Sequence, residues 1–414
     1  MIESKKVQKM LYGGDYNPEQ WPEEIWEEDM RLFHKAHIDV VTLNVFSWAA
    51  LQPDESTYDF SKLDKIMKLV KDNGLKVCMA TSTAAHPAWM ARKYPDILRV
   101  EHNGMKRKFG ARHNSCPNSP NYRKYSAALV EKIAERYKDY DNIVAWHINN
   151  EFGGWCYCEN CEKAFRVWLQ KKYGTLDELN RVWNTSFWSH TMYDWDDVAA
   201  CNMLSEEFLW DGQIRTNFQG ISLDYNRFNS DSMLECFNIE KDILKRITPD
   251  IPVTTNLMGA YKHLDYQKWA KDMDFVSWDN YPAYDAVPGD AAMNHDLMRG
   301  LKQGKPFALM EQTPGVSNWH IYCKLKRPGV MRLWSYEAVA HGADTVMFFQ
   351  MRRSMGACEK YHSGVIEHVG TDDTRVFREI TALGAELDKL QGVTLGARAV
   401  YYTHLRAHET GRNL

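Results

Sequence analysis

Short runs of apolar residues recur along the chain and alternate with segments whose apolar residues follow helical spacing. One such segment is 60–73, in which Leu63, Ile66, Met67 and Val70 fall on one face of a predicted helix. Short apolar runs between helices are typical of buried parallel strands. The runs that predict strands are 11–16, 39–46, 75–81, 143–149, 252–256, 274–278, 306–310 and 344–349.

This alternation predicts an α/β fold, a parallel (β/α)8 TIM barrel, rather than an open doubly wound sheet. No Gly-x-Gly-x-x-Gly turn follows the first predicted strand, which removes the main sign of a dinucleotide-binding fold. The segment from 159 to about 248 is predicted to be mostly helical, so the barrel carries a long helical insertion after strand four. We expect its aromatic middle, 183–188, to form a loop near the mouth of the barrel.

Two other segments depart from the alternation. A long loop is predicted from about 94 to 120, and loops of that length in a compact domain are usually functional. Near the other end, 375–390 has the pattern of an amphipathic helix. We therefore predict a barrel domain over 1–390 that holds the functional site. We expect 391–414 to be the start of a truncated second domain or a disordered tail.

Composition narrows the possible partners. The 414 residues are 44% hydrophobic and 26% charged, with a formal charge of −4 and no long basic run, which argues against nucleic acid and acidic membrane surfaces as partners. No stretch has the length of a transmembrane helix. The polar N-terminus has no signal-peptide pattern, and nine cysteines without such a signal indicate reduced thiols and a cytoplasmic protein.

Two predicted strands end in a glutamate. Glu151 follows strand 143–149 and the amides Asn149 and Asn150, and Glu311 follows strand 306–310. In a parallel barrel the carboxyl ends of the strands converge on one face, where active sites lie. Polar residues are expected there whatever their role, so one glutamate alone indicates little. Two carboxylates across a sugar fit glycoside hydrolysis, in which one protonates the leaving oxygen and the other attacks the anomeric carbon.

A cysteine cluster follows the first glutamate. Cys156, Cys158 and Cys161 lie within six positions, and Cys116 in the preceding long loop can supply a fourth thiolate. Four thiolates around one ion suit a structural zinc site with no open coordination position. Clustered free thiols and iron–sulfur ligation are the alternatives, and the tight spacing in a reducing compartment favours zinc.

Polar and aromatic residues near the predicted strand ends are further candidates. Glu359 and His362 follow strand eight, although ordinary surface charge would also explain them. Trp319 follows Glu311 and offers a flat face for stacking on a sugar. Asp279 and Tyr281 end strand six, where they can line the same pocket, but their positions indicate no specific role.

Three stretches together resemble the β-galactosidases of glycoside hydrolase family 42. They are 13–22, with the sequence GGDYNPEQWP, 147–153, with the sequence HINNEFG, and Met310-Glu311. The resemblance implies a retaining mechanism on galactosides, with Glu151 as acid/base and Glu311 as nucleophile. It also implies that the four cysteines bind zinc, as in many members. The residues that correspond to substrate contacts are Arg112, Asn150, Trp319, Phe349, Glu359 and His362.

The chain departs from the family pattern at its C-terminus. Family members usually continue into an α/β domain that helps to form homotrimers and then into a small β domain, and both are essentially missing here.

Retaining enzymes hold their two carboxyl groups about 5–5.5 Å apart, and we expect that separation. Other readings are a related barrel glycosidase acting on β-glucosides, β-fucosides or α-L-arabinosides, and a non-catalytic sugar-binding barrel.

Overall fold

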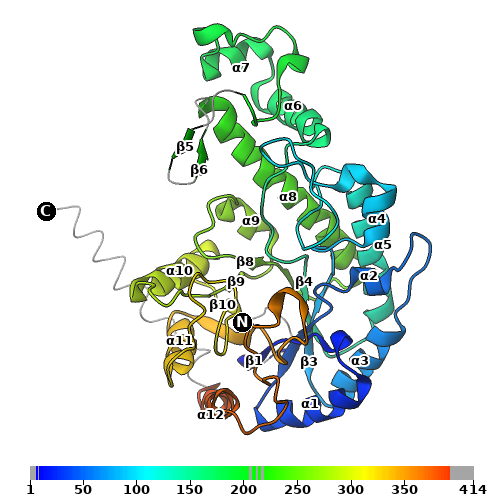
Figure 1. The fold of residues 1–414 in the computed structure, drawn as a ribbon, viewed down its shortest axis with the longest axis vertical. Coiled ribbons are helices and arrows are strands. Elements are labelled where there is room, and N and C mark those ends of the chain that lie inside the picture. The colour runs from blue at the N-terminus through cyan, green and yellow to red at the C-terminus, as the bar shows by residue number, and fades with distance from the viewer. Residues whose placement is uncertain (1–5, 8, 205–207, 211–212, 216–218, 392–414) are drawn as a thin grey trace, which may run out of the picture.

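The structure is a computed structural model that describes residues 6–7, 9–204, 208–210, 213–215 and 219–391. A parallel sheet lies at its centre, and helices surround the sheet (Figure 1). The predicted α/β barrel is confirmed. The strands of the sheet are β1 (Leu11–Asp15), β2 (Val40–Leu43), β3 (Lys76–Ala80), β4 (Ile143–His147), β7 (Val253–Thr254), β8 (Asn256–Leu257), β9 (Ser277–Asp279), β10 (Phe307–Glu311) and β11 (Ala343–Phe348).

The fifth predicted strand is divided into two short strands. β7 pairs with β4 and β8 pairs with β9, and only Thr255 separates β7 from β8. The strand order β7-β4-β3-β2-β1-β11-β10-β9-β8 therefore closes into a barrel of eight strand positions. All pairs in this sheet are parallel, so the carboxyl ends of the strands gather at one mouth.

Burial explains the apolar runs of the sequence. Every residue of β1, β4, β10 and β11 is buried, because helices cover the outside of the barrel while side chains fill its interior. The helices are α1 (Glu23–Lys35), α2 (Trp48–Leu51), α3 (Ser61–Asp72), α4 (Ala88–Lys93), α5 (Pro120–Tyr137), α6 (Glu159–Tyr173), α7 (Leu176–Trp183), α8 (Gln219–Ile247), α9 (Tyr266–Asp272), α10 (Pro288–Leu301), α11 (Val330–Ala340) and α12 (Arg375–Lys389).

Local sequence sets the helix boundaries. In α3 the predicted apolar face of Leu63, Ile66, Met67 and Val70 is buried, and the helix ends before Gly74, whose positive φ of 72° suits glycine. At the start of α5, the Ser119 hydroxyl accepts a hydrogen bond from a backbone N–H in the first turn. Short 3-10 helices lie at Pro18–Gln20 (η1), Pro95–Ile97 (η2), Phe187–Ser189 (η3), Trp195–Asp197 (η4) and Ala357–Glu359 (η5).

The insertion after β4 is mostly helical, as predicted, and consists of α6, α7 and the long helix α8. It also contains an antiparallel hairpin, β5 (Phe208–Trp210) and β6 (Gln213–Arg215), which the periodicity does not indicate. The expectation that 183–188 lies near the barrel mouth is wrong. α7 lies at the far end of the insertion (Figure 1), because Trp183 packs on the insertion's own apolar cluster and donates a hydrogen bond to Asp224 of α8.

The terminal prediction falls almost entirely outside the described residues, since only Gln391 of 391–414 is described. Within the described ranges, none of the helices combines the length and the apolar character that a membrane span requires.

Candidate active site

A pocket opens at the carboxyl ends of the barrel strands. The two predicted catalytic residues and all six predicted substrate contacts line it together, although they come from six separate segments of the chain. The lining residues are Asp15, Phe46, Arg112, Asn150, Glu151, Tyr281, Glu311, Trp319, Phe349, Glu359 and His362.

Glu311 is the last residue of β10 and is buried. Its two carboxylate oxygens each accept a hydrogen bond, one from Asn256 Nδ2 at 3.0 Å and one from Tyr281 Oη at 2.6 Å. Burial raises the pKa of Glu311 well above its ordinary value, and the nearby charges of Asp15 and Glu151 raise it further. The Tyr281 hydroxyl opposes this shift, because its hydrogen bond stabilises the ionised form.

Glu151 is placed differently. β4 ends at His147, and the backbone then passes through left-handed conformations at Asn149, with φ 58°, and at Glu151, with φ 43°. The Glu151 N–H donates to Asn256 Oδ1 at 2.7 Å, and Arg112 forms an ion pair with Glu151 Oε2 at 2.6 Å. Glu151 lies beyond the end of β4, so contacts from other segments hold it in place.

The two glutamates face each other across a short gap. One carboxylate oxygen each from Glu151, Glu311 and Asp279 lie within 4.8 Å of one another. This proximity fits the close carboxylate spacing of retaining glycosidases, about 5–5.5 Å, rather than the roughly 6.5–9.5 Å of inverting ones. Burial, followed by the charges of Glu311 and Glu151, raises the pKa of Asp279 well above its ordinary value.

Aromatic rings form one wall of the pocket. Tyr281 makes edge-to-face contacts with Trp319 and His362, with ring centroids 5.3 and 5.8 Å apart, and Phe349 contacts His362 in the same way. Trp319 is 56% exposed, which leaves ring surface open to a ligand. Burial lowers the pKa of His362 to about 3, so this imidazole is neutral at ordinary pH.

Five residues at the site were missed or given no role by sequence reasoning. Phe46 and Asn256 were not singled out, and Tyr281 and Asp279 received no specific role. Asp15 ends β1, so the rule that identified Glu311 would also have found it; burial, with the charges of Glu359 and Glu151, raises its pKa to about 7. Asn256 ends the predicted strand 252–256 and so gives the same signal of position, but the sequence does not indicate its contacts with segments far away.

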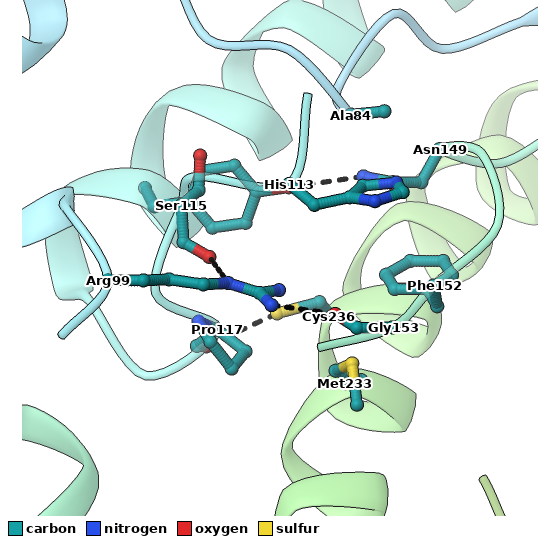
Figure 2. A pocket seen from close by; sticks show the side chains of 11 residues that line it. Ala84, Arg99, His113, Ser115, Pro117, Asn149, Phe152, Gly153, Met233 and Cys236 are labelled. Carbon is teal, nitrogen blue, oxygen red and sulfur yellow. Dashed lines mark hydrogen bonds between the residues drawn. The ribbon is translucent and has the colours of Figure 1, made fainter. Parts of the chain in front are cut away.

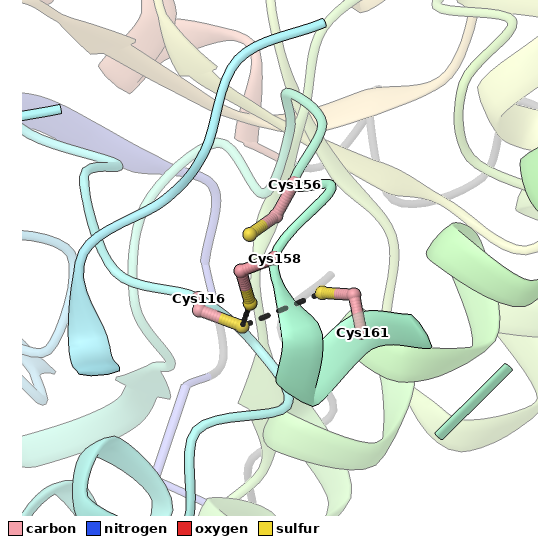
Figure 3. A group of neighbouring side chains, drawn as sticks. All are labelled: Cys116, Cys156, Cys158 and Cys161. Carbon is pink, nitrogen blue, oxygen red and sulfur yellow. Dashed lines mark hydrogen bonds between the residues drawn. The ribbon is translucent and has the colours of Figure 1, made fainter. Parts of the chain in front are cut away.

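The predicted cysteine cluster is assembled. The sulfurs of Cys116, Cys156, Cys158 and Cys161 lie within 4.8 Å of one another (Figure 3), and Cys116 Sγ is 3.4 Å from both Cys158 Sγ and Cys161 Sγ. Thiolates around a tetrahedral zinc lie about 3.8 Å apart, as Zn–S bonds of about 2.3 Å require. Asn118 also donates N–H groups to two of the sulfurs, a contact typical of the surroundings of metal-bound thiolates. The residues thus fit a structural metal.

Comparison with known proteins agrees with the geometry. The model of glycoside hydrolase family 42, described as β-galactosidase, matches residues 15–390. β-Galactosidase BgaP of Planococcus sp. (strain L4) is 61% identical over 394 residues, which are 95% of this chain and 58% of that protein. β-Galactosidase LacZ of Lactobacillus acidophilus is 51% identical over 394 residues, which are 95% of this chain and 59% of that protein.

Solved structures give the same picture. The crystal structure of β-galactosidase from Bacillus circulans sp. alkalophilus matches with a TM-score of 0.93 and 66% identity, over 96% of this chain and 58% of that one. The catalytic domain of a β-amylase from Paenibacillus polymyxa, at 12% identity and a TM-score of 0.62, shares the fold alone. The chain spans somewhat under three fifths of the length of the curated relatives that it matches. By its family match and its close relatives, the chain belongs to the glycoside hydrolase family 42 β-galactosidases.

Proposed function

We propose that this chain hydrolyses terminal β-D-galactosides with retention of anomeric configuration, and that Glu151 and Glu311 carry the reaction. The observation that carries the proposal is a pair of buried glutamates, with one carboxylate oxygen of each within 4.8 Å of the other, in a pocket lined by polar and aromatic residues. Family membership and relatives named as β-galactosidases support the choice of galactoside.

In the first step Glu311 attacks the anomeric carbon while Glu151 gives its proton to the leaving oxygen. The galactosyl group is then bound to Glu311. In the second step Glu151 removes a proton from water, which attacks the anomeric carbon and releases galactose and the Glu311 carboxylate. Hydrogen bonds from Asn256 and Tyr281 suit Glu311 to this role, since both stabilise the carboxylate that must attack and must leave again.

The remaining pocket residues bind and orient the sugar. Asn150 donates to the 2-hydroxyl, and the exposed face of Trp319 stacks on the apolar face of the ring. Phe349, Glu359 and His362 complete the wall around the hydroxyl groups. Arg112 lies in the same lining, where it pairs with Glu151 Oε2 and offers further N–H donors to sugar hydroxyls.

A panel of 4-nitrophenyl glycosides tests the substrate, and NMR of the first-formed product tests the stereochemistry. We expect the β-galactoside to have the highest kcat/KM and β-galactose to appear before the α anomer. Faster turnover of the β-glucoside, β-fucoside or α-L-arabinoside would contradict the proposed substrate, and α-galactose as first product would contradict the mechanism. Galactose binding without turnover would favour a non-catalytic barrel.

We further propose that the metal of the cysteine cluster is zinc, held by Cys116, Cys156, Cys158 and Cys161 in a structural role, and that the protein is cytoplasmic. Four converging thiols without a disulfide support both proposals, because such a site requires reduced cysteines. Metal analysis of protein purified without chelator is expected to give about one zinc per chain. Metal-free protein with four freely titrating thiols at the cluster would contradict this.

A further inference from the structure

A buried arginine lies behind the pocket and reaches the loop that carries Glu151. Arg99 is only 5% exposed and follows η2 in the long loop before α5. Its guanidinium donates from Nη1 to the Gly153 carbonyl at 2.6 Å and from Nε to the Ser115 carbonyl at 2.7 Å (Figure 2). One rigid, charged fork thus joins the segment two residues beyond Glu151 to the segment beside Cys116.

The backbone around Arg99 is itself fixed. Its N–H donates to the Asn114 carbonyl at 2.9 Å, and its own carbonyl accepts from the Arg107 N–H at 2.8 Å. Gly154 packs so closely on the guanidinium that an added Cβ would collide with Nη1, and its φ of 77° also favours glycine. Arg99 is therefore held in one place and restrains the chain that follows Glu151.

Such a restraint matters because the Glu151 loop has little support of its own. Asparagine tolerates the left-handed conformation of Asn149, but that of Glu151 is unfavourable for a glutamate and persists only where surrounding contacts enforce it. The Glu151 N–H is held by Asn256, and the Asn150 carbonyl accepts from His113 Nε2 at 2.7 Å. On the C-terminal side of Glu151, Arg99 holds the Gly153 carbonyl, while Tyr261 and Asn229 hold Gly154, one residue farther from the glutamate.

The space beside Arg99 does not suit a substrate. The cavity has a volume of about 20 Å³ and is lined by His113, Tyr122, Asn149 and Phe152 as well as Arg99. That is room for about one water molecule, far less than a sugar needs. The side chain therefore acts on the site through the backbone and not by touching a ligand.

We propose that Arg99 is a positioning residue for the acid/base glutamate. By tying Gly153 to Ser115, it holds the Glu151 carboxyl within reach of the glycosidic oxygen. It has no contact with Glu311. The inference rests on the proposed role of Glu151. It predicts that Arg99 affects the step in which Glu151 transfers a proton and does not affect the attack of Glu311 on the anomeric carbon.

Leaving-group dependence tests this assignment, because a good leaving group departs without a proton and a poor one does not. The variants are Arg99→Met and Arg99→Lys, and the measurement is kcat/KM for 2,4-dinitrophenyl, 4-nitrophenyl and phenyl β-D-galactosides. For Arg99→Met we expect a loss of about 100-fold with the phenyl galactoside, but less than about 3-fold with the dinitrophenyl one. Arg99→Lys, whose ammonium cannot reproduce the fork, is expected to fall between Arg99→Met and wild type.

Arg123→Met is the matched control. Arg123 also donates to a carbonyl of the long loop, from Nε to Pro117 at 2.6 Å, but it does not contact the segment after Glu151. We expect its effect to be independent of the leaving group. Thermal unfolding checks each variant, and if Arg99→Met does not fold, the comparison of Arg99→Lys with wild type retains the test.

The outcomes separate the two proposals. Equal losses on all three substrates, or no loss at all, would overturn the positioning role of Arg99. A wild-type chain that turns over none of the galactosides would reject the proposed function itself. Wild-type turnover with a Glu151→Ala variant that shows no leaving-group dependence would reject the role of Glu151 on which the inference depends.

Discussion

The ends of β4 and β10 each present a glutamate to the same pocket, yet they do so by different means. Glu311 is the last residue of its strand, and the ladder between β10 and its neighbours fixes its backbone. Glu151 lies four residues beyond β4, in a left-handed backbone held by contacts from β8 and from the long loop before α5. One carboxylate takes its position from the sheet, whereas the other takes it from loops.

This difference fits the different demands of the two proposed roles. An attacking carboxylate has to reach one carbon in a narrow geometry, and a strand end is a rigid support for it. The acid/base group acts on the leaving oxygen in one step and on water in the next. Substitutions at the two strand ends are therefore expected to differ in the size of the activity loss and in how that loss depends on the leaving group.

The largest effect is expected from the two glutamates themselves. Glu311→Ala removes the proposed nucleophile, so we expect kcat/KM to fall by at least about 10⁴-fold for every galactoside. Glu151→Ala is expected to lose about 10²–10⁴-fold for the phenyl galactoside and much less for the dinitrophenyl one. Steady-state kinetics on both substrates make the comparison. The reverse pattern of leaving-group dependence would exchange the two roles.

The next effect concerns the cysteine cluster, which follows only the β4 end. Cys158→Ser or chelation would remove the proposed metal link between the Glu151 loop and the long loop. A loss of about 4 kcal/mol would lower Tm by about 5 °C in a chain of this size. Activity towards the phenyl galactoside is expected to decline more than activity towards the dinitrophenyl one. Cys323→Ser, an exposed cysteine outside the cluster, is the control and is expected to change neither.

Tyr281→Phe acts on the β10 end alone. It removes the hydroxyl that donates to Glu311 Oε2, and this hydrogen bond opposes the rise of the Glu311 pKa. The pKa of Glu311 therefore rises further, and the acidic limb of the kcat/KM profile moves to higher pH. The expected loss near neutral pH is about 10-fold. Tyr284→Phe, at an exposed tyrosine nearby, controls for loss of a hydroxyl; an unmoved acidic limb in Tyr281→Phe would contradict the expectation.

The smallest effect on activity is expected behind the β4 end, where the change is one of stability. Glu240 of α8 is buried beside Thr81 and Thr83, which accept hydrogen bonds from Asn149. Burial raises the pKa of Glu240 from 4.5 to about 8. Between these values the folded protein binds a proton at this carboxyl that the unfolded chain releases. Stability from this group is therefore present below the lower pKa and is lost as pH rises through the higher one.

Glu240→Gln removes this dependence with almost no change of shape. Its Tm is expected to match wild type closely near pH 5 and to exceed it by about 5 °C near pH 9. Differential scanning calorimetry of both proteins across this range gives the comparison. A Tm difference that stays constant with pH would mean that Glu240 does not change its protonation on folding.

The barrel was predictable because buried parallel strands produce continuous apolar runs, and helices between them produce a different period. The same logic found Glu311, which directly ends such a run. The break at Thr255 was not predictable, since a gap of one residue between two strands does not change the pattern of apolar residues. The position of Trp183 was not predictable either, because an aromatic residue at the tip of the insertion has the same pattern as one at a binding site.

The positions of the missed residues have a common cause. Asn256 and Arg99 act through hydrogen bonds to segments far from them in sequence. A single polar residue in a loop or at a strand end carries no mark of such a partner. The resemblance to the family named the residues that line the pocket, but the groups that hold those residues in place became visible only in the folded chain.

The divided strand has a consequence for how the protein refolds. β7 joins β4 and β8 joins β9, so this strand is the seam at which the barrel closes. Asn256, the first residue of β8, hydrogen-bonds both the Glu151 backbone and the Glu311 carboxylate. The pairing of β7 and β8 with their neighbours and the approach of the two glutamates are thus expected to occur in the same folding step. In a refolding experiment the helical circular dichroism signal is expected to return first, and galactoside hydrolysis is expected to return only when the ring of strands is complete.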